Sequence, residues 1–212
     1  MDFERAFKFP TDDPDWIKKV VIGAILSIIP IVNFISFGYA LELLKNIIDS
    51  KEELPEWSEF GGKFVKGLVA VIIYIIYMII PAIIMFVFGG TSIMAMANGH
   101  DAAIAGGIVG FGITMLLVIL LAFVIGFIIP MAIANYIAYD EFGAAFRFSQ
   151  IFDKIKDNFS DYIIMYLIII VVGAVSGFLA GLIPFIGMLI AVFINFYISL
   201  VYAFILGKIY IK

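Results

Sequence analysis

The sequence predicts an all-α protein: a polytopic bundle of transmembrane helices, with a broken or re-entrant N-terminal helical hairpin, four full spans and short amphipathic cytoplasmic helices. The composition is 64% hydrophobic and only 14% charged, whereas soluble domains are about 45–50% apolar and about 25% charged. The charged residues are also clustered, which leaves four uncharged stretches of 22 to 46 residues: Val20–Leu41, Gly67–His100, Ala102–Tyr139 and Tyr162–Gly207. These observations exclude a soluble enzyme and a disordered chain, and the absence of cysteine excludes a disulfide-stapled domain.

The first element, residues 17–48, is expected to form two helical limbs separated at Pro30, because proline cannot continue a helix. About 12 residues precede Pro30 and would span roughly 18 Å, less than the roughly 30 Å hydrocarbon core. Basic residues stay on the cytoplasmic side of a membrane. A re-entrant hairpin places all 13 Lys and Arg residues there, whereas an ordinary crossing divides them nine to four. The re-entrant interpretation therefore puts both termini in the cytoplasm, and a single kinked span is the alternative.

Four full spans are expected to follow within one integral domain that comprises residues 1–212 of a plasma-membrane protein. Each crossing needs about 20 apolar residues, so the longest uncharged stretch accommodates two. The expected spans are residues 67–88, 106–139, 162–182 and 185–207. Four prolines preceded by isoleucine are interpreted as helix breaks: Pro30, Pro81, Pro130 and Pro184.

Two cytoplasmic segments are expected to form interfacial helices, residues 54–66 and 142–159. The second has a periodic apolar face, at Ala145, Phe148, Phe152, Ile155 and Phe159. It is interpreted either as a docking site for lipid or a partner, or as a linker packed on the bundle. Trp16 and Trp57 are expected to anchor the protein at the membrane interface.

The candidate functional residues are uncharged, because nothing in the expected spans is ionisable near neutral pH. A polar pocket near the helix breaks is expected to contain Asn33, Ser36, Asn135, Tyr136 and Asn195. The alternative interpretation is that these side chains form hydrogen bonds between helices.

Glycines four residues apart form two stripes, Gly173, Gly177 and Gly181 in one and Gly106 and Gly110 in the other. Small residues at this spacing let helix backbones approach closely. The stripes are interpreted either as a face for self-association or as packing surfaces within one chain.

The order and spacing of several motifs carry a resemblance to a known family: Asp13-Pro14-Asp15-Trp16, Ile29-Pro30, Gly38-Tyr39, Leu54-Pro55-Glu56-Trp57, Asn135-Tyr136 and Ile183-Pro184-Phe185-Ile186-Gly187. The sequence resembles a family of uncharacterised, largely archaeal, prokaryotic membrane proteins that is described only as a domain of unknown function. More distantly, it is similar to the membrane domain fused to glycerophosphodiester phosphodiesterases. The resemblance implies a multi-pass membrane domain and no activity, because the catalytic domain of those enzymes is absent here.

Two non-catalytic functions follow as hypotheses. The first is a membrane scaffold or accessory protein that self-associates or docks a cytoplasmic or membrane partner. The alternative is a carrier or channel for a lipid or a small neutral solute. We expect membrane lipid as a partner and neither a metal, a cofactor nor nucleic acid, because metal-ligand clusters and polybasic patches are absent from the sequence.

Overall fold

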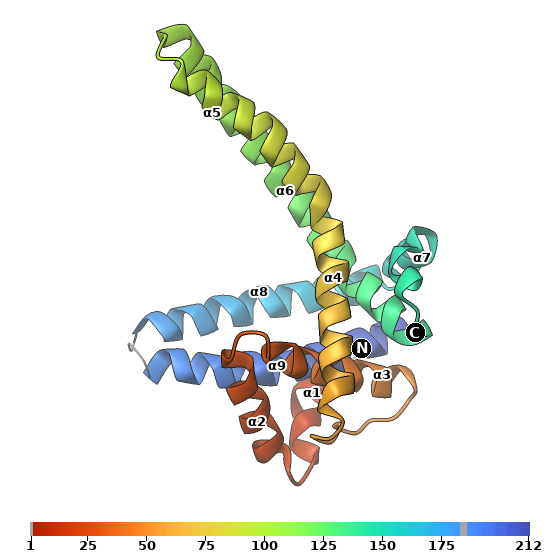
Figure 1. The fold of residues 1–212 in the computed structure, drawn as a ribbon. Helices are drawn as coiled ribbons and strands as arrows, with labels where there is room; N and C mark the ends of the chain where they lie inside the picture. Colours follow the sequence, from red (N-terminus) through yellow and green to blue (C-terminus); the bar gives the residue numbers. More distant parts are fainter. Residues whose placement is uncertain (1, 183–185) are drawn as a thin grey trace. The chain divides into compact units, whose positions relative to one another are not determined.

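A computed structural model of the chain describes residues 2–182 and 186–212, and its regular structure is entirely helical in these ranges (Figure 1). Four helical segments there are long and apolar enough to cross a membrane: Phe60–Ala97, Asp101–Tyr139, Phe159–Leu182 and Ile186–Tyr210. The all-α prediction with four long apolar helices is therefore confirmed. The expected break at Pro184 lies outside the described residues.

The chain divides into two compact units, Met1–Val71 with Met131–Lys212, and Ile72–Pro130. The first unit is built on α2 (Trp16–Ile28), α3 (Asn33–Ile48) and α9 (Ile186–Tyr210), which pack against one another. The short helices α1 (Phe3–Lys8) and η1 (Phe9–Asp12) lie against α9, and α8 (Phe159–Leu182) forms a hairpin with it. The core of this unit lies among these helices, where Tyr39, Leu43, Ile47 and Leu200 are completely buried.

The second unit is a helical hairpin with a single charged residue, Asp101, in its fully described range. Its first limb runs from the part of α4 (Phe60–Ile84) that follows Val71 through the π-helical η2 (Met85–Gly89) into α5 (Gly90–Ala97). Its second limb is the first part of α6 (Asp101–Tyr139). The limbs pack tightly at Gly107, where an added Cβ would lie 2.6 Å from the backbone oxygen of Ser92.

Pro81 and Pro130 do not end helices, so the expected breaks at these two positions are wrong. Pro81 lies inside α4 and Pro130 lies inside α6. A proline removes one hydrogen bond of a helix, and in an apolar environment every further broken bond would leave another polar group without water. The helix therefore continues past the proline.

Residues 54–66 do not form the expected short interfacial helix. The chain between α3 and α4 has no regular structure, and Phe60 already begins α4. Pro55 disfavours a helical conformation at the residue before it. The backbone of Pro55 is held instead by Tyr39, whose hydroxyl donates to the Pro55 carbonyl oxygen at 2.7 Å.

The segment 142–159 forms two short helices instead of one, η3 (Phe142–Phe146) and α7 (Phe148–Asp157). They are separated at Arg147, whose backbone angles (φ −81°, ψ 71°) are not helical. The buried side chains of α7 are Ile151 and Ile155, while Phe148 and Phe152 are about half exposed. Phe148, Ile151, Phe152 and Ile155 nevertheless share one face of α7, whereas Ala145 lies in η3 and Phe159 begins α8.

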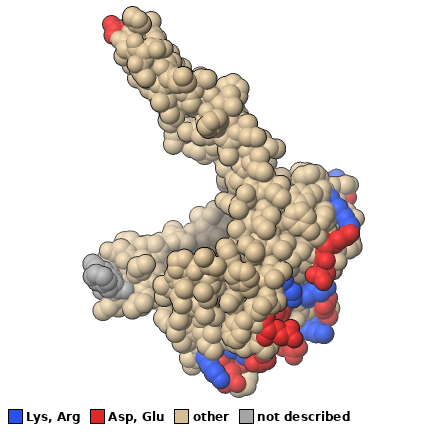
Figure 2. Space-filling model, viewed as in Figure 1, with Lys and Arg blue, Asp and Glu red and all other residues tan. Residues whose placement is uncertain are grey.

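Charged side chains gather on one side of the first unit, as Figure 2 shows. They come from the N-terminal segment, the α3–α4 linker, α7 and the last turn of α9. The uncharged stretch from Tyr162 to Gly207 supplies most of α8 and α9. Charged and uncharged surfaces are thus separated within this unit.

Candidate functional site

The site begins with the turn that joins α2 to α3. The first helix ends at Ile28, and the second begins at Asn33. Between them, Ile31 adopts a left-handed backbone conformation with φ of 71°, which is unusual for a β-branched residue. The turn at Pro30 therefore reverses the chain sharply and brings the end of α2 beside the start of α3.

The hairpin of α2 and α3 closes on α9 through Gly23. A Cβ at Gly23 would lie 1.9 Å from the ring of Phe196, so only glycine lets the ring approach the α2 backbone this closely. The carbonyl oxygen of Gly23 accepts hydrogen bonds from the hydroxyls of Ser27 (2.7 Å) and Ser36 (2.9 Å). Serines from both limbs thus meet at a single backbone oxygen.

A groove of about 350 Å³ lies between α2, α3 and α9, beside this contact. Five uncharged polar side chains line it: Ser27, Asn33, Ser36, Asn195 and Ser199. Phe37 and Phe196 contribute apolar walls. The predicted residues Asn33, Ser36 and Asn195 are therefore brought together, although 159 residues separate the second from the third in the chain.

The two asparagines of the groove retain unused hydrogen-bonding capacity. The side-chain amide of Asn195 donates to the backbone oxygen of Ala191 at 2.8 Å, and Ser199 donates to Phe196 at 2.6 Å. Asn33 is exposed, and its side chain has no hydrogen bond to the described part of the chain. The groove therefore presents amide and hydroxyl groups that a bound molecule can satisfy.

An aromatic cluster supports the groove from within the protein. Trp57 stacks on Tyr39 with ring centroids 4.2 Å apart, and both rings contact Phe196 at 6.0 to 6.2 Å. The indole N–H of Trp57 donates to the backbone oxygen of Lys19 at 2.9 Å. Trp57 therefore packs within the protein and fixes the linker to α2.

Two buried lysines lie beside this cluster and are paired with carboxylates. Lys19 donates to Asp13 at 2.8 Å and to Glu56 at 2.6 Å. Lys63 donates to the Ser58 carbonyl at 2.7 Å and lies 3.2 Å from Glu42. Buried charges require such partners, so these pairs hold the linker between α3 and α4 in place.

The family model for Protein of unknown function (DUF4013) matches residues 22–185. The chain belongs to the DUF4013 family. The match includes Ser27, Asn33 and Ser36 of the groove, whereas Asn195 and Ser199 lie beyond its end. No curated protein and no solved structure matches the sequence significantly.

Asn135 and Tyr136 of this DUF4013 chain do not line the groove. Asn135 is buried and donates to the Ala144 carbonyl at 2.7 Å, while its oxygen accepts from the Tyr210 hydroxyl at 2.7 Å. Its amide also lies 3.4 Å from Gln150. Asn135 therefore connects α6 to η3, α7 and α9. This agrees with the alternative interpretation, in which the polar side chains form hydrogen bonds between helices.

The glycine stripes contribute little to packing within the described chain. A Cβ at Gly173, Gly177 or Gly181 would meet nothing within 4 Å, and the same holds for Gly106. A Cβ at Gly110 would lie 2.8 Å from the hydroxyl oxygen of Ser92, so this position is close to its neighbour. The intrachain interpretation is therefore wrong for the stripe on α8, and the tight approaches are made by other glycines: Gly23, Gly38, Gly67, Gly107, Gly187 and Gly207.

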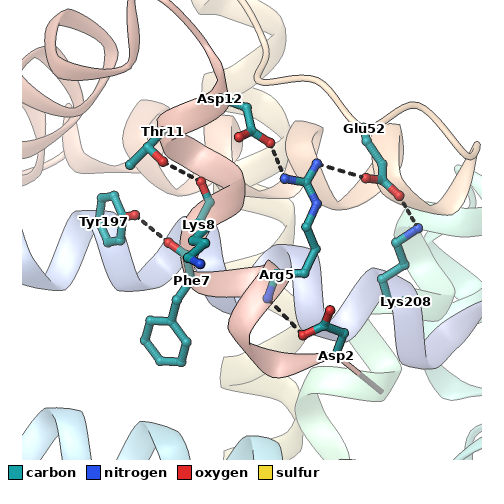
Figure 3. Close-up of polar contacts among 9 residues, drawn as sticks. All are labelled: Asp2, Arg5, Phe7, Lys8, Thr11, Asp12, Glu52, Tyr197 and Lys208. Atoms are coloured by element: carbon teal, nitrogen blue, oxygen red, sulfur yellow. Dashed lines mark hydrogen bonds and ion pairs between the residues drawn. The ribbon is translucent and has the colours of Figure 1, made fainter.

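The N-terminal segment is tied to the linker and to α9, as Figure 3 shows. Arg5 pairs with Asp12 and reaches Glu52 at 3.5 Å, and Glu52 pairs with Lys208 at 2.5 Å. The hydrogen bond from Lys208 is the main cause that lowers the pKa of Glu52 below its ordinary value. These ion pairs connect three chain segments on the charged side of the unit.

Trp16 is the first residue of α2 and packs against Tyr197, with ring centroids 6.0 Å apart. The hydroxyl of Tyr197 donates to the Phe7 carbonyl at 2.6 Å (Figure 3). Trp16 and Tyr197 border a second groove of about 310 Å³ between α2 and α9, and its lining is apolar. Adjacent faces of one stretch of α9 therefore line a polar and an apolar groove.

Sequence reasoning missed Ser27, Ser199 and the two phenylalanines of the polar groove. Ser199 follows Asn195 by four residues, so helical periodicity places both on one face of α9. Ser27 lies three residues before Pro30. These two signals were available in the sequence, whereas the contact of Phe196 with Gly23 depends on tertiary packing.

Proposed function

We propose that this chain is a non-catalytic integral membrane protein that binds and carries a lipid or a small neutral solute. The observation that supports this most directly is the groove between α2, α3 and α9, in which five uncharged polar side chains surround about 350 Å³. Ligand sites typically combine a largely apolar lining with a few placed polar groups. The lining has no ionisable side chain in the described chain, which favours binding of an uncharged group over acid–base catalysis.

The lengths of the two helices beside the groove support a proposed position for it relative to the membrane. With 13 and 16 residues, α2 and α3 are about 20 and 24 Å long, and neither reaches across a roughly 30 Å core. The turn between them exposes Ile28, Ile29 and Ile31. A re-entrant hairpin buries these isoleucines in lipid and leaves the N- and C-termini in the cytoplasm, with plasma membrane as the proposed location.

In this proposed position, an unpaired polar side chain in the groove is energetically costly, and a bound ligand would lower that cost. A polar group in hydrocarbon without a hydrogen bond costs roughly 2–7 kcal/mol, depending on the reference state. The unpartnered amide of Asn33 would bear such a cost at the tip of a re-entrant hairpin. A bound polar molecule or water would remove it. The neighbouring apolar groove at Trp16 and Tyr197 fits the acyl chain of a lipid.

The experiment compares lipid and solute retained by purified wild-type protein with those retained by an Asn33→Leu, Asn195→Leu double variant. Native mass spectrometry from lipid nanodiscs measures the bound molecules. We expect the wild type to retain a bound molecule that the double variant loses, while Asn98→Leu, in the loop between α5 and α6, retains it. A wild type that binds no lipid or solute, or a double variant that binds as well as the wild type, would contradict the proposal.

Self-association is a second candidate function, favoured by the stripe of Gly173, Gly177 and Gly181 on α8. These glycines are exposed and have no neighbour within 4 Å in the described chain, so the stripe is free to meet a second copy. A Gly177→Leu substitution should then shift the protein from dimer to monomer in nanodiscs. Gly112→Leu, at an equally open position of α6, is the matched control. A wild type that is strictly monomeric at all protein concentrations would refute this candidate.

A further inference from the structure

The hydrogen-bonding inventory of the polar groove indicates what kind of molecule it binds. A serine hydroxyl has one hydrogen to donate and two lone pairs to accept with. Ser27 and Ser36 donate their hydrogens to the Gly23 oxygen, and Ser199 donates to the Phe196 oxygen. The three hydroxyl oxygens therefore remain available to a ligand only as acceptors.

The two amides add acceptors as well as donors. Asn195 uses one N–H on the Ala191 oxygen, which leaves its second N–H and its side-chain oxygen. The side chain of Asn33 has no hydrogen bond to the described part of the chain, and it keeps two N–H groups and one oxygen. Five oxygen atoms thus remain as acceptors against three amide N–H donors, and each hydroxyl oxygen can accept twice. The groove has an excess of acceptors.

We infer that the groove binds a neutral polyhydroxyl group, either the sugar or glycerol headgroup of an uncharged lipid or a free polyol. This inference rests on the proposed function and specifies its ligand. Hydroxyls supply the donors that the acceptor-rich lining lacks, and they also accept from the asparagine amides. The C–H faces of a polyol fit against Phe37 and Phe196.

The charge of the lining distinguishes this ligand from charged alternatives. An anion such as a phosphate would face five oxygen atoms and no lysine or arginine among the residues that line the groove. An ammonium ion would supply donors, but a cation removed from water needs an opposite charge, and the lining provides no carboxylate. A neutral donor satisfies the lining without burying an unpaired charge.

The experiment measures binding of three lipids with identical acyl chains to the full-length protein in phosphatidylcholine nanodiscs. The probes are a monoglycosyl diacylglycerol, the same lipid with its sugar hydroxyls converted to methyl ethers, and phosphatidylethanolamine, whose headgroup donates through a charged ammonium. Removal of two or three hydrogen bonds should weaken binding by roughly tenfold or more. We therefore expect the glycosyl lipid to bind at least about tenfold more tightly than its methyl ether and than phosphatidylethanolamine.

Variants and a soluble competitor complete the test. Asn33→Leu and Ser199→Ala should each weaken binding of the glycosyl lipid several-fold, whereas Ser160→Ala, outside the groove, should not. Free glucose or glycerol that binds where the glycosyl lipid does not would support the inference with a soluble source. Equal binding of the glycosyl lipid and its methyl ether would overturn the inference and leave the proposed function standing. Binding of none of the lipids or polyols would overturn both.

Discussion

The closest backbone contact between α3 and α4 gives a prediction about stability. A Cβ added at Gly38 would lie 1.8 Å from the backbone oxygen of Lys63, and one added at Gly67 would lie 2.0 Å from the oxygen of Phe34. Because a Cβ essentially never approaches closer than 3.0 Å, a Gly38→Ala substitution must separate the backbones by about 1.2 Å at that point. The neighbouring contact at Gly67 would open with it.

The magnitude follows from two opposing effects. Overpacking a tight contact costs typically 1–3 kcal/mol, and the upper part of this range applies where the obstacle is backbone. Alanine in place of a helical glycine returns up to about 1 kcal/mol. We therefore expect Gly38→Ala to lower the free energy of unfolding by about 2 kcal/mol. For a chain of this length, that corresponds to a melting temperature lower by roughly 4–8 °C.

Tryptophan fluorescence during thermal unfolding in nanodiscs measures this effect, because Trp57 stacks on Tyr39 immediately beside Gly38. Gly61→Ala is the matched control, since it lies in the first turn of α4 and a Cβ there would meet nothing within 4 Å. The control should melt within about 1 °C of the wild type. If Gly38→Ala melts at or above the wild-type temperature, the close approach of α3 and α4 is not part of the folded protein.

Three further predictions concern the ion pairs, the buried amide and the topology. Because pairing with Lys208 lowers the pKa of Glu52, the pair stabilises the fold above the ordinary carboxyl pKa of 4.5 and loses its effect as pH falls through the lower folded value. Glu52→Gln should therefore reduce the difference between the melting temperatures at pH 7 and pH 3, as measured by thermal unfolding. Tyr210→Phe removes the donor to the buried oxygen of Asn135 and should lower the free energy of unfolding by about 1–3 kcal/mol in a denaturant titration. A cysteine introduced at Ser50 should be labelled by an impermeant reagent only from the inside of the cell, and one introduced at Asn98 only from the outside. Labelling of Ser50→Cys from outside would refute the re-entrant topology.

The sequence predicted the helical class and the long apolar helices because both depend on composition and on the spacing of charges. It could not distinguish Pro30 from Pro81, because a proline has the same local effect at each position. At Pro30 the chain reverses and the two limbs are held together by Ser36 donating to Gly23, a contact between residues 13 apart. At Pro81 the helix α4 continues to Ile84, with one backbone hydrogen bond removed by the proline. A proline alone therefore does not predict which of these positions becomes a turn.

The groove was partly predictable for a similar reason. Asn33, Ser36 and Asn195 are polar residues in apolar stretches, which marks them as candidates for a shared polar site or for hydrogen bonds between helices. Asn135 carries the same signal, but its partners are backbone and side-chain atoms of η3, α7 and α9, which periodicity does not identify. The glycine stripe on α8 likewise has the spacing of a packing face without a packing partner in the described chain. Residue type thus indicated that these side chains interact with another part of the protein. Their interaction partners became known only from the fold.

The width of the groove depends on the same contacts that stabilise the fold. Phe196 forms one wall of the groove, lies over Gly23, and contacts Tyr39 and Trp57 on its other side. A substitution that displaces this ring, such as Gly23→Ala, would therefore alter ligand binding and stability together. Substitutions of Asn33 or Asn195 act differently, because both side chains are exposed and neither contributes a hydrogen bond between helices in the described part of the chain. A loss of binding with unchanged melting temperature in the asparagine variants, but not in Gly23→Ala, would separate recognition of the ligand from construction of the groove.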